Sequence, residues 1–419
     1  MPASSTRATG NPVAPRLSIT WCLAVLVAAL SAGCGGGGGG SGPAPLPTGT
    51  TVNAQGPGAP APSAIGLQAE PALAVPAGAQ PAVLGAWSLA AGGHALAWRN
   101  GTEAAVQVQR FDASGQPEGA AVTLAADLSL AAPAACVLPD GSIVLATVSG
   151  GPASVDEPWI TRTAVLVQRY GPSGTPVGDA VQLGSVEQNR IGAETMRYVT
   201  EPALARWDDG SFVLAWSQVE EDASGRSPQF FGQRFDAGGH PAGGTVPVGS
   251  GDRDTGFQLA AAPAGGWLLT TFHRTFGRTF LRFHAFDGAS APVLPDQAIG
   301  IAEGSLLLPL RGGRAVLLSP AHVYGSLQMY GAGGHPQGMA GALAAMPGSA
   351  FALADGGFVT FTAMEGRVYA QRFDANGHTS GDPVVAAAGA ATLQGAGLAG
   401  GGVAVGWGAA QQVSTQRLR

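Results

Sequence analysis

The side chains that could recognise a ligand gather in three stretches of this 419-residue chain, residues 149–162, 184–200 and 217–229. Each stretch is longer than a connection between strands requires. Loops on a rigid scaffold are where binding residues concentrate, although solvated insertions are equally permitted. Their carboxylates, guanidinium groups and aromatic rings suit a polar recognition surface. The candidate binding residues are Asp156, Glu157, Trp159, Glu187, Arg190, Glu194, Arg197, Tyr198, Glu220, Glu221, Asp222 and Arg226.

Catalytic motifs are the next feature to consider. The sequence contains no G-x-S-x-G, H-E-x-x-H or Walker A pattern, so no catalytic residue is assigned. A glycoside hydrolase needs two carboxylates that face each other, and separate repeats of the chain could supply them, but spacing alone does not show this. A polysaccharide-acting enzyme of the hydrolase or lyase type is therefore the alternative to a binding module.

The histidines and acidic residues do not form a metal-binding pattern. His240, His335 and His378 occupy the same place in different copies of a repeat, and such positions lie too far apart to share one ion. Asp252 and Asp254 alternate as calcium ligands do, but no closing carboxylate follows them. We therefore expect neither a metal nor a cofactor.

An Arg also recurs, and a ring of guanidinium groups could bind anions. Three copies carry Asp two residues later, on the same face of a strand. A local Arg–Asp pair, or hydrogen bonds to turn carbonyls, is the simpler expectation. The repeated residues are Arg110, Arg169, Arg234, Arg372 and Arg417.

The N-terminal 33 residues have the features of an export signal. Arg7 and Arg16 precede an apolar run over residues 17–30, which is shorter than the roughly 20 residues a membrane span needs. Leu-Ser-Ala-Gly then leads directly to Cys34. This resembles the bacterial lipobox, which implies that Cys34 is acylated and that a lipid holds the protein on a membrane. With Gly35 following, the resemblance implies the outer membrane of the cell envelope.

Residues 34–63 consist almost entirely of Gly, Pro, Ala, Ser and Thr. A segment of this composition buries too little apolar surface to offset its conformational entropy, so it is expected to be a flexible tether. Residues 64–419 then form the folded domain. Cys136 remains there as a lone cysteine in an apolar run, which indicates a small buried apolar residue.

A repeat organises the folded domain, and two independent markers count seven copies. One is a Gly-rich turn followed by an apolar strand; the other is a second strand ending in Gln-Arg-Phe or a variant of it. Each copy contains four strand-like runs separated by tight turns. Four short antiparallel strands per copy predict an all-β, seven-bladed β-propeller.

The two ends of the domain suggest how the ring closes. The last copy stops at Arg419 and lacks a fourth strand, whereas residues 65–75 precede the first copy with no partner there. We expect the N-terminal strand to complete the seventh blade, which also covers an exposed sheet edge. The pattern resembles the propeller superfold of the kelch and WD repeat families, although the motifs that carry their binding residues are absent.

Composition limits the partners. Charged residues are 11% of the chain and the net charge is −6, so there is no basic footprint for nucleic acid. The sequence therefore predicts a lipid-anchored propeller of the bacterial cell envelope, a non-catalytic binding or scaffold module for a protein or glycan partner that the sequence does not identify.

Overall fold

The computed structural model describes the chain from residue 67 onward, with short gaps. The described residues are 67–77, 81–100, 105–125, 130–152, 160–189, 195–251, 256–262, 265–275, 278–293, 297–301, 305–310, 314–321, 324–331, 336–345, 347–388, 393–398, 401–409 and 412–419. They belong to the compact unit Ala64–Arg419. Cys34 and the predicted signal and tether lie outside them.

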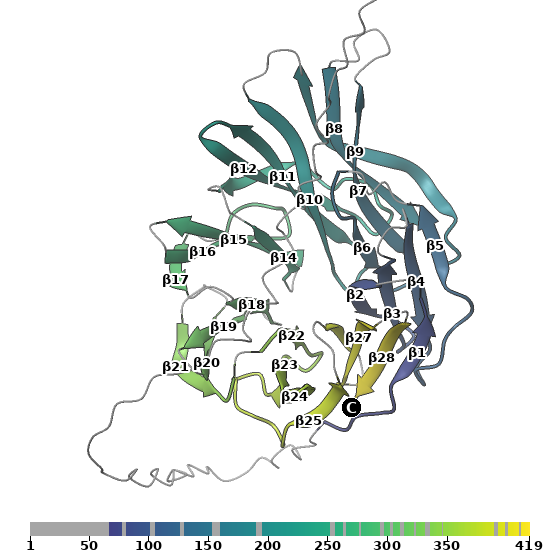
Figure 1. The fold of residues 1–419 in the computed structure, drawn as a ribbon, viewed down its shortest axis with the longest axis vertical. Coiled ribbons are helices and arrows are strands. Elements are labelled where there is room, and N and C mark those ends of the chain that lie inside the picture. Colours follow the sequence, from purple (N-terminus) through teal and green to yellow (C-terminus); the bar gives the residue numbers. More distant parts are fainter. Residues whose placement is uncertain are drawn as a thin grey trace, which may run out of the picture. The chain divides into compact units, whose positions relative to one another are not determined.

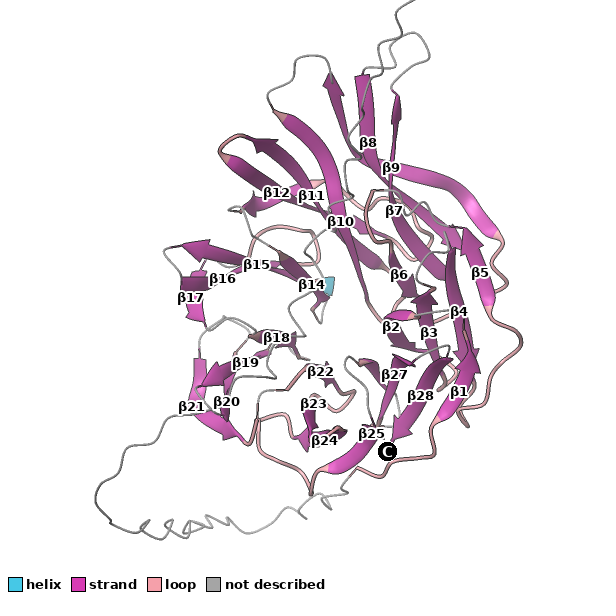
Figure 2. Ribbon diagram, in the orientation of Figure 1, coloured by secondary structure: helices cyan, strands magenta, loops and turns pink. Residues whose placement is uncertain are grey.

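The described chain forms seven four-stranded antiparallel sheets, the blades of a β-propeller, as Figures 1 and 2 show. The all-β prediction and the blade count are confirmed. Within the described residues, no helix is long and apolar enough to cross a membrane.

Blades 1 to 6 each take four consecutive strands, and blade 7 takes three C-terminal strands and the first strand of the domain. The strands of blades 1 to 3 are β2 (Ala82–Ser88), β3 (His94–Arg99), β4 (Ala105–Phe111), β5 (Val122–Ala125); β6 (Ala134–Val137), β7 (Ile143–Pro152), β8 (Ile160–Tyr170), β9 (Pro176–Asn189); β10 (Met196–Arg206), β11 (Phe212–Asp222), β12 (Gly225–Phe235) and β13 (Val246–Ser250). Those of blades 4 and 5 are β14 (Phe257–Ala261), β15 (Trp267–Thr275), β16 (Arg278–Phe286), β17 (Gln297–Ile301); β18 (Leu306–Pro309), β19 (Ala315–Ala321), β20 (Tyr324–Tyr330) and β21 (Pro336–Leu343). Those of blades 6 and 7 are β22 (Ser349–Ala352), β23 (Phe358–Met364), β24 (Arg367–Phe373), β25 (Val384–Ala388); β26 (Gln394–Gly397), β27 (Val403–Ala409), β28 (Gln412–Leu418) and β1 (Leu73–Pro76).

The Gly-rich turns that mark each repeat have a backbone reason. Gly210 and Gly356 sit at equivalent positions between the first and second strands, with φ of 85° and 86°. Residues with a Cβ rarely adopt this left-handed conformation. The N–H of Gly210 closes the turn on the carbonyl of Trp207 at 3.2 Å. The repeated Gly therefore marks a tight turn between the first and second strands.

Apolar side chains of neighbouring blades pack face to face and form the core. Between blades 2 and 3, for example, Val144 and Val165 share one cluster with Phe212, Leu214 and Trp216.

Cys136 belongs to the same cluster and is 0% exposed. Burial is the main cause that raises the pKa of its thiol to about 12, against a smaller opposing effect of Arg206. The prediction that Cys136 is a buried apolar residue is confirmed.

The N-terminal strand closes the ring, as predicted. Strand β1 pairs antiparallel with β28 in the register Leu73↔Thr415 to Pro76↔Gln412, so blade 7 has the order β1-β28-β27-β26. The innermost strand β2 of blade 1 contacts β26 of blade 7 on one side and β6 of blade 2 on the other. The three C-terminal strands of blade 7 are therefore joined to β1 by hydrogen bonds and packing.

The segment before β1 reproduces a turn that other blades make within one continuous chain. In blade 1, the N–H of Glu118 donates to the carbonyl of Arg110 at 2.8 Å. In blade 7, the N–H of Glu70 donates to the carbonyl of Arg417 at 2.9 Å. The backbones of Gln68 and Arg419 also exchange hydrogen bonds, at 2.6 and 3.0 Å. The closure thus copies the hydrogen bonds of a continuous blade.

The repeated Gln has a structural role at this same turn. The Gln109 amide donates to the carbonyl of Gly119 at 3.1 Å, and the Gln371 amide donates to that of Gly381 at 3.0 Å. The Gln416 amide instead donates to the carbonyl of Glu70 at 2.7 Å. The repeated Gln therefore binds the third strand to the segment that leads into the fourth strand. It does so in blades made of continuous chain and also in blade 7, where β1 is the fourth strand.

The three long stretches predicted as loops are mostly strand, and that prediction is wrong. Strands β7 and β8 extend to Pro152 and from Ile160, with residues 153–159 outside the described chain. Strands β9 and β10 likewise reach Asn189 and start at Met196. Residues 217–229 are a continuous hairpin with only two residues in the turn. The chain continues as strand because buried and more exposed side chains alternate: Ser217 and Val219 are buried, whereas Glu220 is exposed. The loop prediction did not take this alternation into account.

Candidate recognition surface

Six strands of blades 2 and 3, β7 to β12, are longer than the strands of the other blades. We call the extended hairpin surface the described residues 149–152, 160–163, 184–189, 196–200 and 217–229. Figure 1 shows the long strands β8 to β12 that carry it. Strand β11 and β12 have 11 residues each, compared with 7 in β23 and β24 of blade 6. The extra length projects polar side chains from a rigid, fully paired ladder.

Arg197 and Glu220 form an ion pair on one face of blade 3. They are register partners on β10 and β11, and Arg197 Nη2 lies 3.2 Å from Glu220 Oε1. Their side chains are 59% and 47% exposed. An exposed pair of this kind contributes at most about 1 kcal/mol to folding, so both groups are available to a partner at little cost to the fold.

Tyr198, Glu221 and Arg226 form a second group across three strands of the same blade. The Tyr198 hydroxyl donates to Glu221 Oε2 at 2.9 Å, and the Arg226 guanidinium lies over the Tyr198 ring, 5.9 Å from its centroid. Glu221 and Arg226 are register partners. Burial, followed by the bond to Glu221, raises the pKa of Tyr198, so the phenol stays neutral at physiological pH.

Blades 2 and 3 are tied together below these groups. The N–H of Val199 donates to Thr163 Oγ1 at 3.0 Å, and the N–H of Arg197 donates to Gln188 Oε1 at 2.8 Å. Glu187 forms an ion pair with Arg162, its register partner on β8. Hydrogen bonds therefore join the two extensions to each other.

Asp222 serves the hairpin turn. Its Oδ1 accepts hydrogen bonds from the N–H of Ser224 at 2.7 Å and the N–H of Gly225 at 3.1 Å, which is an Asx-turn. The Ser224 hydroxyl donates to the same oxygen at 2.5 Å. This carboxylate shapes the turn.

The structure places six of the predicted residues in blade 3 and Glu187 in blade 2. In blade 3 they form two groups, on opposite faces of the sheet, and Asp222 lies in the turn. Sequence reasoning did not select Arg162, whose position opposite Glu187 depends on strand register, nor the exposed Met196, which is 52% exposed. The predicted residues that lie outside the described chain are Asp156, Glu157, Trp159, Arg190 and Glu194.

Glu220 and Glu221 do not form an acid–base pair. Glu220 and Glu221 are consecutive strand residues, so their side chains point to opposite faces of the sheet. Glu220 is paired with Arg197, and Glu221 is bonded to Tyr198. The two groups therefore cannot flank one glycosidic bond.

Three of the repeated Arg residues have structural partners, which are an expected turn carbonyl in one case and Asp residues other than the expected ones in two. Arg169 pairs with Asp140 at 3.0 Å, and Arg372 pairs with Asp355 at 2.5 Å, both in the turn between the first two strands of the same blade. The Arg417 guanidinium donates to the carbonyl of Ala113. The expected Asp partners are used elsewhere because they cap their own turns, as Asp112, Asp236 and Asp374 do toward backbone N–H groups.

His240 and His378 are exposed turn residues, as predicted. Each Nδ1 lies near the carboxylate of the residue four positions earlier, Asp236 at 3.4 Å and Asp374 at 3.3 Å. His335 lies outside the described residues, as do Asp252 and Asp254. Among the side chains that the structure describes, no group of three or more could hold a metal ion.

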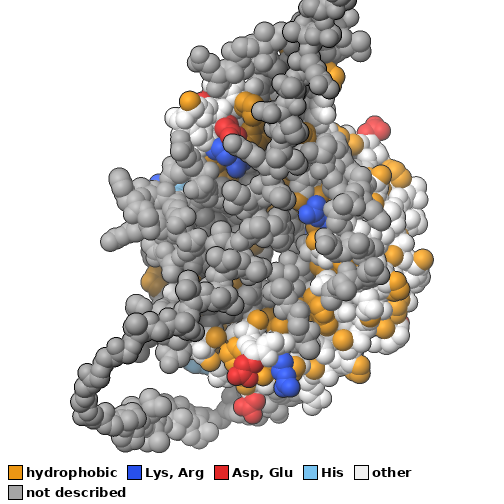
Figure 3. All heavy atoms as spheres, viewed as in Figure 1, with side chains coloured by type: hydrophobic (Ala, Val, Ile, Leu, Met, Phe, Trp, Pro, Cys, Tyr) orange, Lys and Arg blue, Asp and Glu red, His pale blue; other side chains and the backbone are white. Residues whose placement is uncertain are grey.

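Charged side chains are sparse on the face drawn in Figure 3. The described acidic and basic groups occur there singly or in small mixed groups, and apolar and uncharged atoms separate them.

Comparison with known proteins supports no family assignment. No protein-family model matches the sequence, and no curated protein matches it. Solved structures resemble the fold. The chain is 11% identical to an α-L-arabinofuranosidase from Fusarium graminearum in complex with an iminosugar inhibitor, over 83% of this chain and 98% of that one, with a TM-score of 0.43. It is 13% identical to an α-L-arabinanase from Penicillium chrysogenum, over 82% and 98%, with a TM-score of 0.41. It is 10% identical to the Dos1 propeller, over 85% and 96%, with a TM-score of 0.43. At these identities and scores the likenesses carry no argument about activity.

Proposed function

We propose that this chain is a lipid-anchored propeller of the bacterial cell envelope that acts as a non-catalytic recognition module. In this proposal the extended hairpin surface binds a protein or glycan partner. Cys34 would carry the lipid, and residues 34–63 would tether the propeller to the outer membrane.

One observation carries the proposal. Blades 2 and 3 extend their hairpins as a rigid ladder and place mixed charges and an aromatic ring on it, although a short hairpin suffices elsewhere in the ring. Exposed, pre-organised charges favour specificity and association with a charged partner.

The arrangement of the described groups favours recognition over hydrolysis. Each described carboxylate of the surface is engaged by an Arg, by a Tyr or by its own turn. Ion pairs between exposed side chains are easily exchanged for pairs with a partner, because they contribute little to stability. A hydrolase would need an acid and a base on one face of a cleft.

The decisive experiment shortens the blade 3 hairpin to the design that blade 6 already uses. Met364↔Arg367 is the last pair of the blade 6 hairpin, which turns through Glu365-Gly366, and its blade 3 equivalent is Gln218↔Gln229. Replacing residues 219–228 by Glu-Gly therefore removes the extension and keeps the register. We expect an intact fold and loss of the partners that the full chain recovers from envelope protein and polysaccharide fractions.

A charge swap provides a test that leaves the backbone unchanged. Arg197→Glu combined with Glu220→Arg retains the ion pair but inverts the charges offered to a partner. We expect at least tenfold weaker binding, whereas Glu365→Arg at the blade 6 turn serves as the matched control and should bind normally. Unchanged binding by both the shortened and the swapped protein would refute this surface as the binding site, and polysaccharide cleavage by the full chain would refute the non-catalytic role.

A further inference from the structure

Adjacent blades meet at an equivalent pair of residues at every seam of the ring. One residue of the pair is the first residue of the second strand of a blade. The other lies on the third strand of the preceding blade, three positions before that strand ends. At six seams both residues are apolar or Gly. These pairs are Val108 and Ile143, Val167 and Phe212, Gly232 and Trp267, Phe283 and Ala315, Leu327 and Phe358, and Ala370 and Val403.

The seventh seam, between blades 7 and 1, departs from this rule at both positions. Here the pair is Thr415 and His94, which are 3% and 0% exposed. His94 stacks on Phe111 with ring centroids 4.6 Å apart and an interplanar angle of 7°. In blades 3, 4 and 6 two aromatic residues stack in the equivalent place. His94 therefore fills an aromatic core position with a group that can be protonated.

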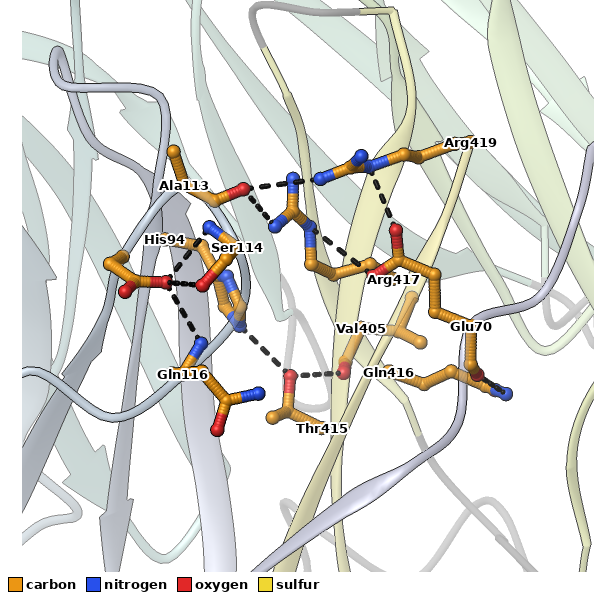
Figure 4. A network of polar contacts seen from close by, with 11 residues as sticks. Glu70, His94, Ala113, Ser114, Gln116, Val405, Thr415, Gln416, Arg417 and Arg419 are labelled. Atoms are coloured by element: carbon orange, nitrogen blue, oxygen red, sulfur yellow. Dashed lines mark hydrogen bonds and ion pairs between the residues drawn. The ribbon is translucent and has the colours of Figure 1, made fainter.

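The hydrogen bonds at this seam define the neutral form of His94. Figure 4 shows His94 Nε2 directed at Thr415 Oγ1, 3.0 Å away, and the Thr415 hydroxyl donating to the carbonyl of Val405, also at 3.0 Å. Because that hydroxyl proton is already donated, Nε2 must carry its own proton and donate to Oγ1. His94 Nδ1 is then unprotonated, buried and without a hydrogen-bond partner among the described residues.

The groups around His94 oppose a second proton. Burial and the charge of Arg417, which is 6% exposed on β28, lower the pKa of His94 to about 4, and Asp112 at the end of β4 acts weakly in the other direction. Asp112 is already occupied by the N–H groups of Ser114 and Gln116. On the N-terminal segment, Glu70 faces Arg419 at 2.9 Å and Arg417 at 3.9 Å. From β27 only the backbone carbonyl of Val405 enters the network.

We propose that the seam between blades 7 and 1 is an acid-sensitive closure, in which neutral His94 holds the ring shut and protonated His94 releases the C-terminal strands β26 to β28 of blade 7 from blade 1 and from β1. A protonated ring would place a buried charge beside Arg417 and an N–H for which the described residues offer no acceptor. Thr415 also lies on β28, the strand that is held to β1 by hydrogen bonds and packing alone. The two polar departures therefore coincide with the non-covalent join of the ring.

Amide hydrogen exchange on the full chain, corrected for the intrinsic effect of pH, measures this release. Seam opening that frees His94 allows the proton to bind at its ordinary pKa of 6.5, whereas the closed seam allows it at about 4. Linkage then predicts that protection of β1 and β28 is roughly 20-fold lower at pH 5 than at pH 7. Amides of β7, β11 and β23, at other seams, should keep their protection.

Two variants isolate His94. His94→Phe with Thr415→Val installs the residue types of other seams, and His94→Gln retains a donor toward Thr415 without a titrating ring. Both should show equal protection at pH 5 and pH 7, whereas His240→Gln, which removes an exposed histidine, should behave as the parent protein. The proposal is overturned if β1 and β28 keep their protection at pH 5 in the parent, if all seams lose protection equally, or if the acid effect persists in both His94 variants.

Discussion

Truncating Leu67 to Ala tests how much the N-terminal segment contributes to ring closure. Leu67 lies just before the closing hydrogen bonds of Gln68 and is only 4% exposed. Its side chain belongs to the core cluster that contains Val403 and Leu418 of blade 7. The substitution therefore removes core contacts and leaves the closing backbone bonds in place.

The magnitude follows from the atoms removed. Leu→Ala deletes three carbons from a nearly dry site, which costs about 2.4 kcal/mol at roughly 0.8 kcal/mol per carbon. Incomplete collapse of the resulting cavity brings the loss to about 3 kcal/mol, within the range measured for buried Leu→Ala changes. For a domain of about 350 residues, an unfolding entropy of roughly 0.7 kcal/mol per kelvin converts this loss into a lower Tm by about 4 °C.

The assay is thermal unfolding of the full chain, with Leu130→Ala as the matched control. Leu130 undergoes the same chemical change but is 48% exposed, so its loss should stay below about 1 kcal/mol. Hydrogen exchange should also show reduced protection in β1 and β28 for Leu67→Ala alone. If Leu67→Ala lowers Tm no more than Leu130→Ala does, the N-terminal segment does not stabilise the closure and the reasoning fails.

Three further predictions concern single groups. The free energy of unfolding should fall by about 3 kcal/mol as the pH is lowered from 6.5 to 4, because His94 is protonated near pH 6.5 in the unfolded chain and only near pH 4 in the folded chain. Denaturant titrations should show this loss in the parent protein and not in His94→Phe. Cys136 should resist maleimide at pH 8 in the folded protein and react after denaturation, since its thiol is buried with a pKa of about 12; rapid labelling of the native protein would contradict this. Cys34→Ser should prevent acylation and move the protein out of the membrane fraction, and unchanged processing and partition of this variant would rule out the lipid anchor.

Part of the fold could be predicted because its causes are local. A left-handed Gly such as Gly356 is needed wherever the chain turns tightly between two strands, so the turn leaves a mark in the sequence. The repeated Gln that follows each apolar run is equally local, since its amide bonds within its own blade, as Gln371 does to Gly381. Counting these marks gave seven blades, and the unmatched ends of the chain indicated that the N-terminal strand completes the last one.

The candidate site was predicted only in part, because sequence spacing does not specify strand register. The polar stretches of blades 2 and 3 look like loops, yet residues 217–229 continue the ladder and place Glu220 and Glu221 on opposite faces. Register also decides that Arg197 meets Glu220 and that Arg162 meets Glu187. For the same reason, the Asp partners of the repeated Arg residues differ from the expected ones. Arg169, for example, pairs with Asp140, which is 29 residues away in the sequence.

The sequence by itself determined the repeating unit, its four strands and the direction in which the chain closes, since turns and side-chain alternation depend on neighbours a few residues apart. Only the tertiary structure decided which repeats differ in a way that matters. His94 and Thr415 are 321 residues apart and look unremarkable in the sequence. They become a buried polar pair because the closed ring brings its first and last blades together, and a contact of that kind depends on the whole fold and not on any local pattern.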